Sequence, residues 1–77
     1  MEKNVRLRIL LVMELIVQET NEEHGVTMAE IIEWLADHNI AGERKSIYED
    51  IHALQEYGLS IRYAQEDKTY RLIPNAE

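Results

Sequence analysis

The hydrophobic periodicity of this sequence changes once, at Gly58, and that change indicates the fold class. Before Gly58, apolar residues recur at intervals of three and four, which is the spacing of helix faces packed on a core. After Gly58, apolar and polar residues alternate, as in a strand with one covered face. The 77 residues suffice for one domain. We therefore expect a single α+β domain over residues 1–77.

Three helices are expected, over residues 4–19, 27–38 and 43–57. The second begins at a capping box, in which the Thr27 side chain accepts from the Glu30 amide and Glu30 reaches back. Gly42 closes the following turn as an N-cap, and Gly58 ends the third helix. The expected inward positions of the second and third helices are Met28, Ile31, Ile32, Leu35, Ile47, Ile51 and Leu54.

The first helix is apolar around most of its circumference. One wide face, expected in the core, holds Val5, Ile9, Val12, Met13, Ile16 and Val17. A second stripe holds Leu7, Leu11 and Leu15. This stripe also needs cover, which a partner subunit, a missing neighbouring domain or the folded-back hairpin can each supply.

A two-stranded hairpin is expected over residues 60–73. Ile61 and Tyr63 alternate with Ser60 and Arg62, and residues 64–68 form a polar turn. Tyr70 and Leu72 lie on the inner face of the return strand. Because an isolated hairpin is marginal in water, this one must pack on the helices, beside the third, as a wing.

The order of helix, short glycine-containing turn and helix is that of a helix-turn-helix, whose second helix fits the major groove of duplex DNA. Side chains off its inward face can hydrogen-bond bases and phosphates. Arg6 and Arg8 of the first helix can also approach the DNA backbone. The candidate contacts on the third helix and hairpin are Arg44, Lys45, Ser46, Tyr48, Glu49, His52, Arg62 and Lys68.

Structural roles compete with DNA contact at several positions. Arg44 and Lys45 can form a surface ion pair with Glu49, and Tyr48 can pack sideways against the turn. His52 suits the rim of an interface as well as its centre. We expect Asp50 to be structural and Trp34 to pack on the core, with base stacking as the lesser alternative for Trp34.

The net charge of −7 favours a rival function. Residues 21–42 hold five acidic side chains and no Lys or Arg, whereas DNA-binding domains usually carry a basic surface. The alternative is an acidic protein-interaction module, including a phage-encoded mimic of DNA. The acidic block consists of Glu22, Glu23, Glu30, Glu33 and Asp37.

The sequence gives little support to metal-binding, membrane-spanning or enzymatic functions. Without Cys, the chain has no disulfide or thiolate metal site, which suits a reducing cytoplasm. His24, His38 and His52 lack metal-ligand spacing, and no glycine-rich phosphate loop occurs. No uncharged run is long enough for a membrane span. We therefore expect no enzyme activity, cofactor, metal or small-molecule site in this segment.

The run Arg44-Lys45-Ser46-Ile47-Tyr48-Glu49-Asp50-Ile51, continued to Leu54, resembles the recognition-helix region of WYL-domain transcriptional regulators. Residues 21–31 and Tyr70-Arg71-Leu72 extend the resemblance from about Val5 to Leu72. The N-terminal domains of that family are DeoR-like winged helices. The resemblance implies sequence-specific DNA binding by a bacterial or phage regulator, usually dimeric, through Arg44, Lys45, Ser46, Tyr48 and Glu49.

Two features depart from that family. Its members often carry a basic residue at the position of Glu49. They also continue into a ligand-sensing domain after the wing, whereas this chain ends at Glu77, as a fragment or as a naturally short protein. In a fragment, the Leu7–Leu11–Leu15 stripe would contact the missing domain or a second subunit.

Overall fold

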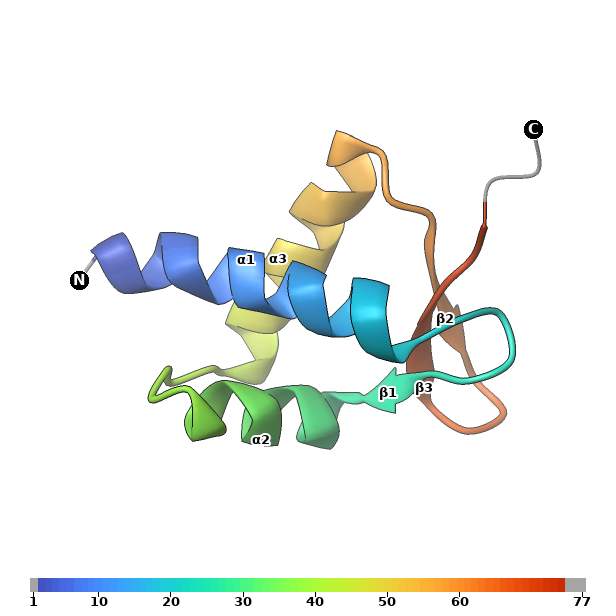
Figure 1. Ribbon diagram of the computed structural model, residues 1–77, viewed down its shortest axis with the longest axis horizontal. Helices are drawn as coiled ribbons and strands as arrows, with labels where there is room; N and C mark the ends of the chain where they lie inside the picture. Colours follow the sequence, from blue (N-terminus) through green and yellow to red (C-terminus); the bar gives the residue numbers. More distant parts are fainter. Residues whose placement is uncertain (1, 75–77) are drawn as a thin grey trace.

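The computed structural model describes residues 2–74, as three helices and a small antiparallel sheet (Figure 1). The predicted helices are present, with ends that differ from the prediction by two residues or fewer. In chain order the elements are α1 (Glu2–Glu19), β1 (Val26–Thr27), α2 (Met28–Asp37), α3 (Arg44–Tyr57), β2 (Ile61–Ala64) and β3 (Thr69–Leu72).

The predicted hairpin is present as the antiparallel pair β2 and β3, and the sheet has a third, unpredicted strand in the order β1-β3-β2. β1 adds to the outer side of β3, where Val26 pairs with Tyr70. Gly25 permits this approach, because a Cβ there would lie 2.5 Å from Thr69 Oγ1 and 2.6 Å from the Tyr70 carbonyl oxygen. Strand β1 was not predicted from the sequence, because two residues are too few to establish an alternating pattern.

The core lies between the three helices and the inner side of the sheet. The predicted inward positions of α2 and α3 are buried, except that Ile32 is half-buried, and Trp34 packs partly against them as expected. The core side chains are Val12, Leu15, Ile16, Val26, Met28, Ile31, Leu35, Ile40, Ile47, Ile51, Leu54, Ile61 and Tyr70.

The structure orients α1 differently from the prediction, in which one stripe faced the core and the other needed cover from elsewhere. Leu15 is buried in the core of this chain and Leu11 packs against it, so Leu15 cannot serve as a contact for another chain or domain. Val5 and Val17, predicted to face inward, are exposed. The helix turns its Val12–Leu15–Ile16 side to the core. Of the second stripe, only Leu7 is exposed.

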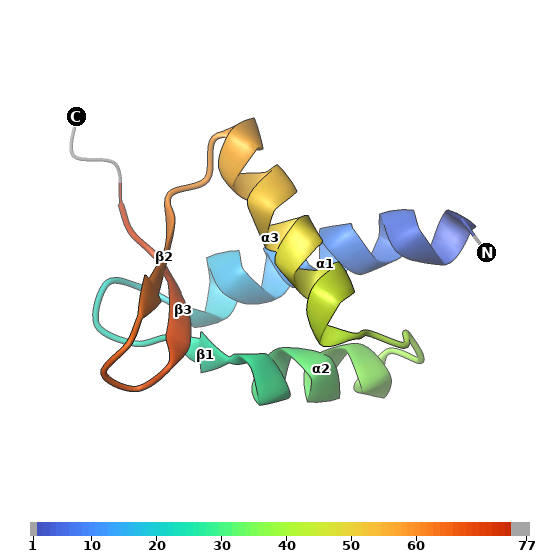
Figure 2. The same ribbon diagram turned by 180° about the vertical axis from the view of Figure 1, so that it is seen from behind.

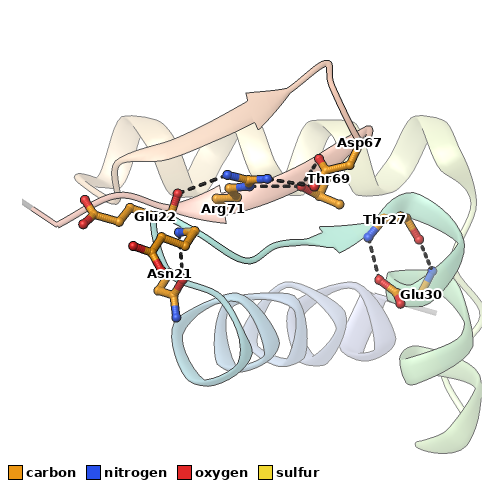
Figure 3. A network of polar contacts seen from close by, with 8 residues as sticks. Asn21, Glu22, Thr27, Glu30, Asp67, Thr69 and Arg71 are labelled. Atoms are coloured by element: carbon orange, nitrogen blue, oxygen red, sulfur yellow. Dashed lines mark hydrogen bonds and ion pairs between the residues drawn. The ribbon is translucent and has the colours of Figure 1, made fainter.

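Polar contacts fasten the sheet to the end of α1 and to the loop that follows it. Thr20 Oγ1 donates to the Ile16 carbonyl at 2.7 Å and accepts from the Leu72 amide at 2.9 Å. Arg71 on β3 donates to the Glu22 carbonyl at 3.1 Å (Figure 3). The Thr20–Leu72 and Arg71–Glu22 bonds join segments about fifty residues apart and hold the hairpin against the helices.

The helix ends follow the predicted chemistry with one exception. The Thr27–Glu30 capping box is present, with bonds of 3.1 and 2.8 Å (Figure 3). Gly58 ends α3 at φ 134°, a conformation that favours glycine. Gly42, however, is not the N-cap of α3; Glu43 is, without a side-chain cap bond. Gly42 instead lies close to the core, since a Cβ there would lie 2.8 Å from Leu35.

A buried ion pair joins α1 to α3. Arg8 donates from Nε to Asp50 Oδ2 at 2.5 Å and from a terminal nitrogen to Oδ1 at 3.0 Å. The two side chains are 13% and 7% exposed. The hydrogen bonds to Asp50 raise the pKa of Arg8 above its ordinary value. Asp50 is therefore structural, as predicted, whereas Arg8 is engaged inside the domain and does not point to an external phosphate.

Breaking this ion pair should destabilise the domain. Asp50→Leu leaves the Arg8 charge without its partner, and we expect a loss of roughly 2 kcal/mol in the free energy of unfolding, because the pair is largely but not wholly buried. Urea denaturation measures the loss. The double variant Arg8→Met/Asp50→Leu should recover most of it, since an apolar pair needs no charge partner. A double variant no more stable than Asp50→Leu would contradict this role.

Candidate nucleic-acid interface

α2, the turn after it and α3 lie on the same side of the molecule as the hairpin. In Figure 2, α3 crosses in front of α1, with α2 below it and the β2–β3 hairpin beside it. The outward side of α3 and the hairpin therefore belong to one face. α1 lies behind α3 in this view and leaves that face open.

A shallow hollow of about 400 Å³ lies where α2, α3 and the hairpin meet. α3 contributes Arg44 and Tyr48 from its first two turns, and the hairpin contributes Tyr63 and Lys68, among others. The N-terminus of α2 contributes residues 27–29. Within residues 5–74, whose side chains the structure describes, neither Arg44 nor Lys68 is in an ion pair; those seen are Arg8–Asp50 and Arg71–Asp67.

Three tyrosines form one wall of the hollow. Tyr63 and Tyr70 are paired across β2 and β3, with ring centroids 4.9 Å apart. Burial raises the pKa of Tyr70, and hydrogen bonding with Tyr48 raises it further. The nearby Arg44 charge acts in the opposite direction. The Tyr70 phenol therefore stays protonated at neutral pH, close to the exposed Arg44.

The hairpin turn holds Lys68 in an unusual backbone conformation. Its φ of 60° lies in the left-handed region, which costs a non-glycine residue roughly 1 kcal/mol. The turn places Lys68 among the residues that line the hollow, together with Arg44. Outliers of this kind often occur where a side chain is placed for binding.

The predicted DNA contacts separate into groups in the structure. Arg44, Tyr48 and Lys68 meet at the hollow. Lys45 is exposed and Ser46 half-buried on α3, but neither lines the hollow. Arg62 is exposed on β2 next to Tyr63 in sequence, so its side chain lies on the opposite face of the hairpin.

The remaining two candidates lie further along α3. Tyr48, Glu49 and His52 line a more open depression that continues to Glu56. Two carboxylates give this part of α3 an acidic character. The Glu49 charge contributes to the raised pKa of Arg8, so it has a basic neighbour within the domain. Gln55 is held by a 2.8 Å bond from Nε2 to the Ile61 carbonyl and is structural.

The sequence prediction missed Tyr63 and the N-terminus of α2. Alternation assigned Tyr63 to the covered face with Ile61, and Ile61 is buried while Tyr63 is 44% exposed. Each strand residue advances about 3.3 Å, so Tyr63 lies about 7 Å further toward the hairpin tip, where its side chain borders the hollow instead of the core. An aromatic pair near a predicted turn that carries a Lys would have been a usable signal.

The acidic side chains of α2 form a stripe opposite the core. Glu30, Glu33 and Asp37 are exposed and fall within about 60° of one another on a helical projection, whereas Ile31 and Leu35 are buried on the other side. Glu22 and Glu23 are exposed in the loop before β1. The negative charge is thus concentrated on the outer side of α2 and on that loop.

Among residues 2–74, no group of three or more His, Asp or Glu side chains could hold a metal ion, and no helix is long and apolar enough to cross a membrane. The chain matches no protein-family model, no curated protein and no solved structure.

A polar network closes the hairpin turn beside the hollow (Figure 3). Thr69 Oγ1 donates to Asp67 Oδ1 at 2.7 Å, and Arg71 donates to Asp67 Oδ2 at the same distance. The hydrogen bond from Thr69, followed by that from Arg71, lowers the pKa of Asp67. Arg71 is thus paired with Asp67 within the turn, whereas Lys68 is exposed.

The Asp67 network predicts a small acid-sensitive contribution to stability. Because the folded-state pKa lies below the ordinary 3.8, the contribution is present above pH 3.8 and is lost as the pH falls through the folded-state value. Thermal unfolding of the wild type and Asp67→Asn should therefore differ at neutral pH and converge in acid. A difference in melting temperature that does not shrink in acid would contradict the assignment.

Proposed function

We propose that this chain is a winged helix-turn-helix domain that binds duplex DNA as part of a transcription regulator, with α3 as the recognition helix and the β2–β3 hairpin as the wing. The observation that carries the proposal is the hollow shared by α3, the hairpin and the start of α2. It brings two cations from different elements, Arg44 and Lys68, to the open face in a chain whose net charge is −7.

Each element of the hollow suits one part of a duplex. An α-helix fits the major groove, where Arg44 and Lys45 at the start of α3 can donate to guanine acceptors. Lys68 at the hairpin tip and the Tyr48 hydroxyl suit phosphate oxygens. The first amides of α2 add donors and the positive end of a helix dipole.

The acidic net charge lowers the affinity expected for DNA, but it does not alter the shape of the candidate interface. Phosphate binding releases counterions and scales with the number of cations that reach the backbone. With few cations at the hollow and an acidic stripe on α2, we expect weak nonspecific binding. Affinity for a preferred sequence must then come from base contacts by α3.

The first test removes the two cations at the start of α3. Arg44→Gln/Lys45→Gln should abolish detectable duplex binding in fluorescence anisotropy, because both the base donors and the local positive potential are lost. In wild type, log affinity should fall with log salt concentration by about 0.9 per phosphate contacted.

A matched control separates local contact from net charge. Gln18→Glu/Ala36→Glu changes the net charge by the same amount at two exposed helix positions outside the hollow. It should retain most of the affinity. Equal loss in both double variants would mean that α3 has no special role and that net charge alone governs binding.

A second test uses the strained turn residue. Lys68→Gly should raise the free energy of unfolding by roughly 1 kcal/mol, because glycine adopts φ 60° without steric cost, and should weaken duplex binding by removing a phosphate contact. Chemical denaturation and anisotropy on the same protein measure both. Asn39→Gly, at the other non-glycine positive φ of 63°, should leave binding unchanged. Unchanged binding in Lys68→Gly would exclude the hairpin tip from the interface.

One observation favours a second function. The exposed stripe of Glu30, Glu33 and Asp37 on α2 suits a basic protein surface, so an acidic protein-interaction module, including a mimic of DNA, is the alternative. A folded wild-type protein that binds no duplex even at low salt would favour it over DNA binding.

A further inference from the structure

An apolar surface lies on α1, away from the α3–hairpin face. Leu7, Leu10 and Val17 of α1 are 46%, 55% and 46% exposed, and Tyr57 at the end of α3 is 79% exposed. In Figure 1, α1 lies in front of α3, and no other described element covers it on that side. Exposed apolar side chains grouped on one element indicate a binding surface rather than chance exposure.

Part of this surface is a groove between α1 and the end of α3. It has a volume of about 310 Å³ and is lined by Ile9, Leu10, Met13, Ala53, Leu54 and Tyr57. Leu10, Met13 and Val17 follow one another at i, i+3 and i+7, so they form a narrow stripe along α1. This spacing is that of a helix packed against another helix.

The exposed charges on α1 change sign along the stripe. Arg6 lies one turn before Leu10 on the same face, and Glu14 flanks the stripe after Met13; both are exposed. They are eight residues apart, about 12 Å along the helix, which is too far for an ion pair within α1. An antiparallel copy of the same helix would bring Arg6 of each chain near Glu14 of the other.

We propose that this α1 surface binds a second copy of the chain, with the two α1 helices antiparallel across a two-fold axis. Leu10 of each copy lies opposite Leu10 of the other, beside the groove at Tyr57, and Leu7 lies opposite Met13. The surface is self-complementary, as a two-fold interface requires, because Arg6 and Glu14 carry opposite charges and lie four residues before and four residues after Leu10.

Charge favours a second copy at this surface over other contacts between copies. The chain carries −7, and the α2 stripe of one copy would repel that of another. The α1 surface is locally balanced, since Arg6 offsets Glu14. The interface uses none of the residues that line the hollow, so the proposal stands whether or not the chain binds DNA.

The proposed dimer contact lies on a different side of α1 from the contact that the sequence predicted. The sequence assigned it to Leu7, Leu11 and Leu15, but Leu15 is buried and Leu11 half-buried. The new stripe joins Leu10 to Met13 and Val17, two residues predicted to face inward. Leu7 keeps a flanking position, opposite Met13 of the second copy.

Sedimentation equilibrium over a concentration series tests the proposal. Wild type should approach the dimer mass as concentration rises, while Leu10→Glu should weaken dimerisation by at least about tenfold, because it places a charge in an apolar contact. Ala36→Glu, which adds the same charge at an exposed position of α2 outside both the groove and the hollow, is the matched control and should dimerise like wild type. Circular dichroism confirms that each variant is folded.

Charge exchange tests the antiparallel arrangement itself. Arg6→Glu and Glu14→Arg should each weaken the dimer by several-fold, since each places like charges opposite each other, and Arg6→Glu/Glu14→Arg should restore it. A folded wild type that stays monomeric up to about 100 µM would overturn the proposal. A double variant that dimerises no better than the single ones would overturn the antiparallel arrangement, as would dimerisation by Leu10→Glu equal to wild type.

Discussion

The ion pair between Arg8 and Asp50 is the directional side-chain contact that joins α1 to α3 in the described part of the chain. It has two hydrogen bonds and lies at the edge of the helix contact, where both side chains are largely buried. A buried charge needs a partner of fixed geometry, so the pair restricts the position of α3 along α1 more than the non-directional apolar contacts around it. With that side of α3 held inward, Arg44, Tyr48 and His52 are left on its outer side.

The rest of the candidate interface depends on how the sheet is attached. Thr20 bonds the end of α1 to β3, and Arg71 bonds β3 to the loop before β1. Gly25 lets that loop pass close to β3. These contacts fix the hairpin beside α3, so Lys68 and Arg44 face the same hollow although they lie on different elements.

Much of the fold follows from local signals in the sequence. The capping box at Thr27, the glycine at 58 and the change of periodicity located α2, the end of α3 and the hairpin. The short strand β1 was missed because its pairing depends on contact with β3, which no local pattern records. The inward face of α1 was misassigned because a helix apolar on most sides leaves its rotation to tertiary packing.

The candidate site was less accessible to prediction. Arg44, Tyr48 and Lys68 were named from the sequence and meet at one hollow. Arg8 was wrongly considered as a contact to the DNA backbone. Its ion pair with Asp50 joins residues 42 positions apart, and no local pattern in the sequence indicates such a pair. Arg62 was named with Lys68, although alternation turns it to the other side of the strand from Tyr63. Side-chain type and the direction of Arg62 were thus predictable from the sequence, whereas the direction of Arg8 required the tertiary structure.

The central claim is that the face shared by α3, the start of α2 and the hairpin binds duplex DNA. Titration of isotope-labelled protein with a short duplex, followed by amide chemical shifts, tests it most directly. The account predicts shifts grouped at residues 27–29, 44–48 and 63–68, with little change at Glu33 and Asp37. Shifts confined to α1 or to the acidic stripe of α2, or no shifts at low salt, would contradict it.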